Sequence, residues 1–397
     1  MPDGTAACTI QDIPPALQTA PMAPFTAPRT LQATSRDYLP SLTGLRFGLA
    51  VWVIFHHICG GGMLLEAWAN RLPAPVLGLI HGGYLAVQTF FVLSGFVLAR
   101  TYAHVVWDRR SLGRFATARF ARIYPVYFFS LIVLSPFIIE MLLTPVWSAA
   151  QRVSLLTNYF LVLQGWTPPL AVGWNTPAWT LSCEFFFYAC FPLLFVLMRK
   201  ARWTAIGVAM VISIITPIML DHAGVPWHWK PIYHLSDFIA GIAAARMFTL
   251  LEGSPAWRKR GFWLYLPALA LGGWLIIHAN VVDGTGADLN TYLRPLNVAL
   301  LLGLALGGGW LARALATRPA DFLGKASYSM YVLHVPILWW YGRYYVHGKL
   351  QPSRPMAAVI YLLLVMGAAG LVFKWLEAPA SEWLRARQKK FARSSRK

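Results

Sequence analysis

Long apolar stretches alternate along the chain with short polar segments that carry most of its charge. A helix needs about 20 mostly apolar residues to cross a bilayer, and ten stretches meet that requirement. They cover residues 43–62, 83–103, 123–143, 176–198, 203–220, 232–250, 262–280, 294–314, 326–343 and 356–376. The pattern therefore predicts an all-α integral membrane protein with about ten transmembrane helices, organised as one membrane domain over residues 39–380.

Three segments lie outside the apolar pattern. Residues 1–38 are rich in Pro, Ala and Thr and contain no long apolar run, which predicts a flexible tail. Residues 381–397 predict a solvated basic tail. Residues 144–175 form the longest connection, and their stretch VSLLTNYFLVLQGW is apolar enough to lie at the membrane surface or to dip into the bundle. A true span there would invert every later helix.

The positive charges favour one orientation of these spans. With the N-terminus placed in the cytoplasm, twenty-five of the 34 lysines and arginines fall in inner segments and seven, Arg294 among them, in outer ones. Cytoplasmic segments of membrane proteins carry such an excess, so both termini are expected to be cytoplasmic. The net charge of +19 is thereby explained by membrane topology, and no nucleic-acid partner is expected.

Neither cysteines nor histidines show the spacing of a metal site. Cys8, Cys59, Cys183 and Cys190 form no paired framework, and we interpret them as small buried apolar residues. The histidines outside the spans form no pair at ligand spacing. No metal is expected.

The first span, GLRFGLAVWVIFHHICGG (residues 44–61), carries the most informative charged and titratable groups. Arg46 and His57 are eleven residues apart, which is three helical turns, so they share one face to within about 20°. His56 lies roughly 80° to the other side of Arg46. An imidazole deep in a membrane usually marks a pathway or a reaction centre, and it can remove a proton from an alcohol near neutral pH. His57 is therefore the candidate base.

Seven blocks in order resemble acyltransferase family 3, the integral-membrane O-acyltransferases. SLTGLRFGLAVWVIFHH resembles the family's first helix, in which ten residues separate an arginine from an essential histidine; Arg46 and His57 fit that spacing. The other blocks are GGYLAVQTFFVLSGFVLAR, RFATARFARIYPVYFF, NTPAWTLSCEFFFYACFPLL, YHLSDFIAGIAAAR, FLGKASYSMYVLHVPIL and WLEAPASEWLR, over roughly residues 38–385. Thr43 and Gln88 depart from the family, where acidic residues are common.

The resemblance implies a multi-pass enzyme of the inner (cytoplasmic) membrane that transfers an acetyl group from acetyl-CoA to a carbohydrate hydroxyl. The acceptor would be a lipid-linked or polymeric unit, such as exopolysaccharide or lipopolysaccharide. Some relatives carry an additional esterase-like domain. None is expected in this chain, so either the single polypeptide suffices or a separate polysaccharide-assembly partner helps. Two alternatives stay open: a proton-coupled transporter of a small solute or lipid-linked sugar, and an assembly partner without chemistry.

Candidate site residues fall into three groups. The catalytic group is His57, Glu184 and Arg46, with Glu184 either orienting the imidazole or positioning the acceptor hydroxyl. Guanidinium groups match the phosphates of coenzyme A, and topology alone would explain only some of the arginines between residues 100 and 122. The expected acyl-CoA ligands are Arg109, Arg110, Arg114, Arg119 and Arg122, and the expected cavity-lining residues are Ser94, Trp179, Ser182, Tyr331 and His334.

Overall fold

The computed structural model describes residues 38–167, 173–224, 230–278, 289–346 and 353–383, together with residue 386. Those residues contain helices and no β-strand. Both predicted tails fall almost entirely outside this part of the chain, as does Cys8. The elements, in chain order, are α1 (Pro40–Cys59), α2 (Glu66–Ala69), α3 (Ala74–His81), η4 (Gly82–Leu85), α4 (Ala86–Thr101), α5 (Arg109–Leu142), α6 (Ala149–Phe160), η5 (Gln164–Trp166), η7 (Thr176–Ala178), α7 (Trp179–Met198), α8 (Trp203–His222), α9 (Pro231–Leu251), α10 (Pro255–Ile277), α12 (Leu289–Leu306), α13 (Gly309–Leu315), α14 (Arg318–Val346), α15 (Arg354–Val372) and the π-helical turn η8 (Phe373–Glu377).

The prediction of an all-α membrane protein is confirmed. Within the described residues, nine helical segments are long and apolar enough to cross a membrane. The tenth expected span, residues 326–343, forms the middle of α14, which is not one of the nine. Its composition explains the difference, because α14 contains serines, tyrosines and a histidine that the surrounding helices bury.

Helix α5 begins fourteen residues before the span that the apolar pattern predicts. Asp108 caps it, since its carboxylate accepts a hydrogen bond from the Ser111 backbone at 2.6 Å and its own backbone N–H donates to Ser111 Oγ at 2.7 Å. This reciprocal capping box satisfies two backbone groups at the helix start. The arginine-rich segment is therefore the first part of a 34-residue helix.

The predicted span over residues 294–314 is wrong in register. Helix α12 ends at Leu306, and Gly307, Gly308 and Gly309 then adopt φ values of 73°, 119° and 76°. Only glycine takes such values in succession without strain. The glycine run separates α12 from the short helix α13 and moves the span to Leu289–Leu306.

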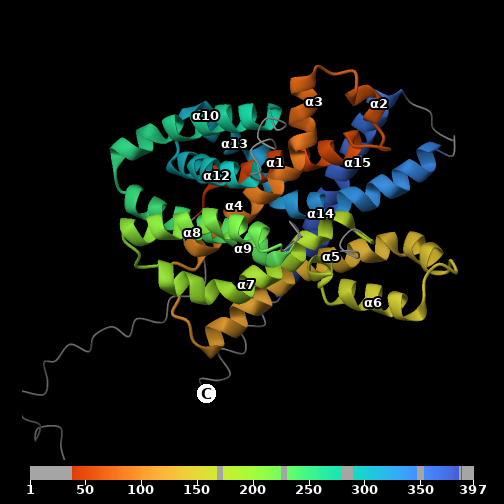
Figure 1. The fold of residues 1–397 in the computed structure, drawn as a ribbon, viewed down its shortest axis with the longest axis horizontal. Coiled ribbons are helices and arrows are strands. Elements are labelled where there is room, and N and C mark those ends of the chain that lie inside the picture. Colours follow the sequence, from red (N-terminus) through yellow and green to blue (C-terminus); the bar gives the residue numbers. More distant parts are fainter. Residues whose placement is uncertain are drawn as a thin grey trace, which may run out of the picture.

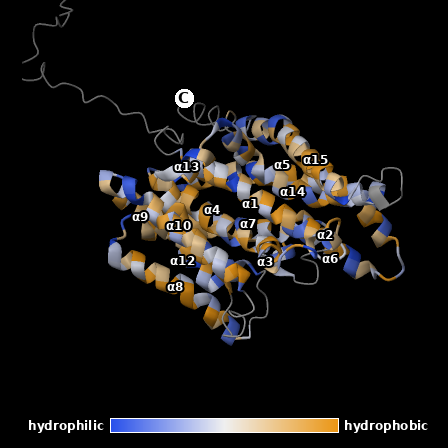
Figure 2. Cartoon of the chain, turned by 90° about the horizontal axis from the view of Figure 1, so that it is seen from above, coloured by the Kyte–Doolittle hydropathy of each residue, from blue (hydrophilic) through white to orange (hydrophobic). Residues whose placement is uncertain are grey.

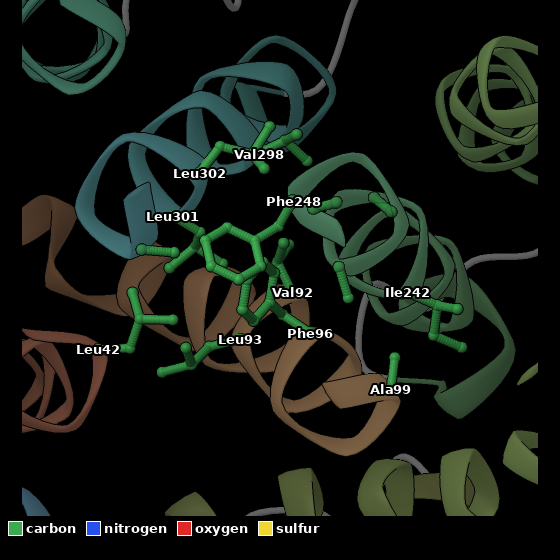
Figure 3. Packing of buried hydrophobic residues seen from close by; sticks show 14 of the residues in the cluster. Leu42, Val92, Leu93, Phe96, Ala99, Ile242, Phe248, Val298, Leu301 and Leu302 are labelled. Atoms are coloured by element: carbon green, nitrogen blue, oxygen red, sulfur yellow. The ribbon is translucent and has the colours of Figure 1, made fainter. Parts of the chain in front are cut away.

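Helices α4, α9 and α12 lie beside the start of α1 (Figure 1), and apolar side chains form a core between them. Figure 3 shows Phe96 of α4 and Phe248 of α9 beside Val298 and Leu301 of α12. The rings of Phe96 and Phe248 pack edge to face, with centroids 5.7 Å apart. Helices α4, α9 and α12 are the enclosed part of the bundle. In α8, α10 and α15, less than a third of the residues in the apolar segment are buried. Hydrophobic residues predominate along those three outer helices (Figure 2), as expected of surfaces that face lipid.

Small residues let α4 and α9 approach closely. A methyl group added at Gly95 would overlap the carbonyl oxygen of Phe238, and one at Gly241 would overlap that of Val92. Glycine at both positions brings the two backbones into contact, a common arrangement between membrane helices.

A buried polar cluster connects α4, α9 and α12. Asp237 accepts hydrogen bonds from Arg294 Nε at 2.6 Å and Gln88 Nε2 at 3.0 Å, and its second oxygen lies 3.0 Å from His234 Nδ1. Arg294 is completely buried, so counting it in an outer segment was wrong. Its charge is matched by Asp237, which is how an intramembrane arginine becomes tolerable.

Residues 144–167 do not span the membrane. Helix α6 has 12 residues, too few to cross a bilayer. After α6 the chain returns to the bundle: Ser182 Oγ of α7 donates to the Val162 carbonyl at 2.7 Å and accepts from the Gly165 N–H at 3.0 Å. Gln164 adds a bond to the Ala178 carbonyl at 2.7 Å. The segment therefore dips into the bundle without inverting the later helices.

Candidate active site

A cavity of about 860 Å³, counting its open mouth, lies between α1, α4, α5, α7 and α14. Its wall combines apolar residues with a group of ionisable and hydroxyl side chains. Those polar lining residues are Arg46, Ser94, Thr101, Arg119, Arg122, Thr180, Glu184, Tyr188, Ser327, Tyr328 and Tyr331. Five helices far apart in sequence thus contribute to one chamber, which is the main candidate for substrate binding.

The cavity has an excess of positive charge. Arg46 of α1 and Arg119 and Arg122 of α5 contribute guanidinium groups, whereas Glu184 of α7 is the one carboxylate that lines the chamber among the described residues. The four groups are close enough to interact electrostatically. Such a wall favours an anionic ligand with several phosphate or carboxylate groups.

Arg119 packs on two tyrosine rings in the cavity wall. Its guanidinium lies over the rings of Tyr102 and Tyr188, 5.9 Å from each centroid. Its Nε atom is buried and has no hydrogen-bond partner among the described residues. Buried donors are normally paired, so this unpaired N–H is an unusual feature of the cavity wall.

Arg122 is held in place by a second carboxylate behind the wall. Its terminal nitrogen lies 3.1 Å from Glu377 Oε1, and Glu377 Oε2 accepts a 2.7 Å hydrogen bond from Ser329. Glu377 is 1% exposed. It therefore fixes the π-helical turn η8 to α5 and α14 and orients Arg122 at the same time.

Glu184 lies among the arginines. Its Oε2 accepts a hydrogen bond from Tyr188 Oη at 2.7 Å, one helical turn further along α7. No hydrogen bond among the described residues joins it to His57. The expectation that Glu184 orients the histidine is therefore not met; a role beside the substrate in the cavity is compatible with its place.

His57 lies at the other end of α1 from Arg46, next to a second histidine. Its Nδ1 is 2.9 Å from the Val53 carbonyl oxygen and 3.4 Å from His334 Nε2. The two rings meet edge to face with centroids 4.8 Å apart. His57 is half-buried and His334 fully buried, so the accessible part of the pair is on His57.

Tyr331 separates this histidine pair from the cavity. Its ring lines the cavity beside Phe90, and its backbone carbonyl accepts a hydrogen bond from His334 Nδ1 at 2.6 Å. Its hydroxyl donates to the Pro177 carbonyl at 3.3 Å. The site thus has two parts, a basic chamber and a histidine pair, with Tyr331 between them.

His56 makes different contacts from His57, as the helical geometry predicts. Its Nδ1 donates to the His81 carbonyl at 2.7 Å, and its ring packs on Tyr84 with centroids 5.7 Å apart. Those contacts attach α1 to the α3–η4 corner. The structure therefore gives His56 a packing function.

The structure brings only part of the expected site into the cavity. Of the five expected acyl-CoA ligands, Arg119 and Arg122 line it, whereas Arg109 and Arg110 are exposed near the start of α5 and Arg114 is half-buried outside the lining. Ten residues of helix, about 15 Å, separate Arg109 from Arg119, which is why an arginine-rich segment cannot converge as a whole on one chamber.

Two of the five residues that we expected in a cavity wall line this cavity, and three do not. Ser94 and Tyr331 line the cavity. The oxygen of Ser182 is already bonded to the chain around Gly165. Trp179 packs between Phe91 and His234, and His334 lies behind Tyr331.

Sequence reasoning missed Tyr188 as a member of the site and the contact of Glu377 with Arg122. Tyr188 follows Glu184 by four residues in CEFFFY, a helical spacing that places the two side chains together. Glu377 contacts Arg122 across 255 positions of sequence, and no local pattern indicates such a contact. Within the described part of the chain, no group of three His, Cys, Asp or Glu residues could hold a metal ion.

The described residues thus form a helical membrane bundle that encloses a basic chamber next to a histidine pair. Residues 39–374 match the family described as an acyltransferase domain. The chain belongs to this acyltransferase family, which confirms the resemblance and sets the transporter and assembly alternatives aside.

Of three curated relatives, two are named as acyltransferases. The chain is similar to acyltransferase MdmB of Streptomyces mycarofaciens, at 29% identity over 88% of this chain and 93% of the relative. It is similar to O-acetyltransferase OatA of Staphylococcus aureus, at 24% identity over 87% of this chain and 57% of OatA. Exopolysaccharide production protein ExoZ of Rhizobium meliloti is 29% identical over 64% of this chain and 75% of ExoZ. No solved structure matches the chain. The protein is thus a multi-pass membrane O-acyltransferase.

Proposed function

We propose that this O-acyltransferase takes an acetyl group from acetyl-CoA and transfers it to a hydroxyl of a carbohydrate. The observation that supports the donor best is the chamber lined by Arg46, Arg119 and Arg122. Coenzyme A carries a pyrophosphate and a 3′-phosphate, and forked guanidinium groups bind such oxyanions in two-point contacts. The carbohydrate acceptor is suggested by the names of two relatives, the O-acetyltransferase OatA and the exopolysaccharide protein ExoZ.

In this proposal the two substrates approach from opposite ends of α1. Acetyl-CoA enters the basic chamber from the cytoplasm. The distribution of positive charge favours a cytoplasmic location for both termini and for the start of α5. The acceptor reaches His57, which is partly exposed at the far end of α1. Eleven helical residues place His57 about 16 Å from Arg46 along the helix axis, so the thioester end of the donor must extend past Tyr331 to meet the acceptor.

His57 takes part in the transfer by one of two routes. In direct transfer, His57 Nε2 takes the hydroxyl proton as the new C–O bond forms and the thioester C–S bond breaks; the proton then passes to the departing sulfur, which leaves as CoA thiol. In the second route, His57 Nε2 attacks the thioester, so that a C–N bond to the acetyl group forms as the C–S bond breaks and CoA leaves as thiolate. The acceptor hydroxyl then attacks the acetyl group, the C–N bond breaks as the C–O bond forms, and the hydroxyl proton goes to the CoA thiolate. Both routes end with the acetyl ester and free CoA.

An inner-membrane location follows from this proposal, because acetyl-CoA is a cytoplasmic metabolite and the acceptor is exported. Lipid-linked or polymeric saccharides, handled together with separate assembly partners, are the acceptors that suit an enzyme with its base at the outer end of a membrane helix. No metal has a role in either route.

The test measures CoA release by the purified full chain in lipid nanodiscs. With acetyl-CoA and a panel of oligosaccharide acceptors, the wild-type protein should release free thiol in an acceptor-dependent way, and mass spectrometry should find the acceptor heavier by one acetyl group. His57→Ala should lower both signals at least about 100-fold. Release that is independent of every carbohydrate, or acetylation by His57→Ala at the wild-type rate, would refute the proposal.

A further inference from the structure

The contact between His57 and His334 carries an inference about how the base is prepared. The two residues are 277 positions apart in sequence, on α1 and α14, and their facing nitrogens lie 3.4 Å apart. The family resemblance points to His57, whereas the sequence pattern left His334 open between a hydrogen bond to a neighbouring helix and a place in the cavity wall. The structure removes it from that wall and places it directly beside the proposed base.

The proton positions on both rings follow from their carbonyl partners. A carbonyl oxygen only accepts hydrogen bonds, so a ring nitrogen that bonds to one must carry a hydrogen. His334 Nδ1 lies 2.6 Å from the Tyr331 carbonyl, so its hydrogen is on Nδ1. In neutral His334 the Nε2 atom is then the acceptor, and Nε2 is the atom that faces His57.

The same reasoning applies to His57. Its Nδ1 lies 2.9 Å from the Val53 carbonyl, so Nδ1 carries a hydrogen. This N–H has two acceptors, the Val53 oxygen and the more distant His334 Nε2. The lone pair of neutral His57 is therefore on Nε2, the nitrogen that neither contact uses.

His334 is itself rigidly held. It is 0% exposed, and its backbone carbonyl accepts a 2.8 Å hydrogen bond from Tyr361 Oη of α15, which is also fully buried. With its ring N–H bonded to Tyr331 on the same helix, both ends of the residue are fixed. Its Nε2 acceptor consequently has a defined position relative to α1.

We infer that His334 is a positioning residue, which accepts from His57 Nδ1–H and so keeps His57 Nε2 as the nitrogen that reacts. The inference rests on the proposed function, in which His57 is the base or the acyl carrier. When Nε2 gains a proton or an acetyl group, positive charge spreads to Nδ1–H, and hydrogen bonds to charged donors are about twice as strong as neutral ones. His334 therefore stabilises the charged form of His57 more than the neutral form.

Two substitutions separate positioning from packing. His334→Gln keeps an amide oxygen near the place of Nε2, whereas His334→Leu fills the site without an acceptor. His334→Leu should lower kcat about tenfold and leave both KM values unchanged. A tenfold loss is at the low end of what a hydrogen bond to a charged group contributes, because this contact is long. His334→Gln should recover part of that loss. Thermal unfolding of each variant in detergent serves as the folding control.

A double-mutant comparison shows whether His334 acts through His57. In a His57→Gln background, adding His334→Leu should cause no further loss of the residual activity, because the partner it positions is gone. Equal fold-losses from His334→Leu in both backgrounds would overturn the inference. If His57→Gln itself is fully active, the proposed function fails first.

A spectroscopic measurement works without turnover. In ¹⁵N-histidine-labelled full-length protein, the His57 signals, assigned by their loss in His57→Gln, should show a protonated Nδ1 and an unprotonated Nε2. His334→Leu should shift the His57 Nδ1 signal as one acceptor disappears. A protonated Nε2 in the wild type, or an unchanged Nδ1 signal in His334→Leu, would refute the positioning role whether or not the acceptor is known.

Discussion

Replacing Arg119 with Gln is the most direct test of the donor chamber. Arg119 lines the cavity, and its buried Nε has no hydrogen-bond partner among the described residues. Glutamine keeps a polar side chain of moderate length and removes one positive charge. Nothing in the described structure uses the Arg119 charge for an ion pair, so its loss should affect ligand binding more than folding.

The expected magnitude follows from the kind of contact that is lost. A hydrogen bond to a charged group contributes about 1.5–3 kcal/mol when its partner is left without a substitute. Each 1.4 kcal/mol is a factor of ten, so KM for acetyl-CoA should rise about 10-fold to 150-fold. Because the phosphates lie far from the reacting carbon, this contact is the same in the ground and transition states, and kcat should stay nearly constant.

Arg122 is a poorer choice for this experiment. Its removal leaves Glu377 as a buried carboxylate without its cation, and breaking a buried pair on one side costs about 3–5 kcal/mol. Loss of activity in that variant would mix damaged folding with damaged binding. Arg119 avoids the problem.

The matched control is Arg110→Gln, which removes the same charge from an exposed position on the same helix. Initial rates of CoA release by both variants in nanodiscs, measured across acetyl-CoA concentrations at a saturating acceptor, give the two KM values. Arg110→Gln should change KM less than twofold, and the small change should shrink at high salt because exposed charges are screened. Equal rises in KM for the two variants would refute the chamber as the donor site. They would indicate that acetyl-CoA binds at the exposed start of α5 instead.

Other expected outcomes follow from the same geometry. His57→Ala should lower the acetylation rate at least 10²–10⁴-fold, as loss of a general base does, whereas His56→Ala should cost about 1 kcal/mol of stability and leave kcat intact; the reverse result in acetylation assays at equal membrane abundance would refute the face assignment. Glu184→Gln should lower KM for acetyl-CoA, because the chamber loses its carboxylate; a rise would mean that Glu184 holds the guanidinium groups in place. Gly95→Ala should reduce thermal stability by about 1–3 kcal/mol through overlap with the α9 backbone, and Gly207→Ala, with open space at its Cβ, should not.

Much of the fold is predictable because the bilayer imposes a simple rule on the sequence. The apolar stretches of the sequence predict nine of the ten spans near their observed positions, because a helix that crosses the bilayer needs a hydrophobic length of about 20 residues however it packs. The predictions failed where another physical effect decided the boundary. Gly307–Gly309 ended α12 early, and the capping box at Asp108 started α5 inside a charged segment that hydropathy ignores.

The site was predictable only where its residues share one helix. Arg46 and His57 could be related by helical periodicity, and the Glu184–Tyr188 hydrogen bond follows a spacing of four. Contacts between helices could not be derived in this way. The partner of Asp237 is Arg294 rather than the Arg246 on its own helix, whose Nε instead donates to the Ala201 carbonyl at 2.9 Å.

The two parts of the site depend on one helix pair. Helix α1 carries Arg46 in the chamber and His57 at the far end, and α14 carries Tyr331 and, behind it, His334. The pair is locked in register at its start, where a methyl group at Gly324 of α14 would overlap the backbone of α1. A slide of one turn, about 5.4 Å, would separate His334 from His57 and Tyr331 from the chamber together. Close backbone packing at one end of the pair therefore determines the distance between donor binding and proton transfer at the other.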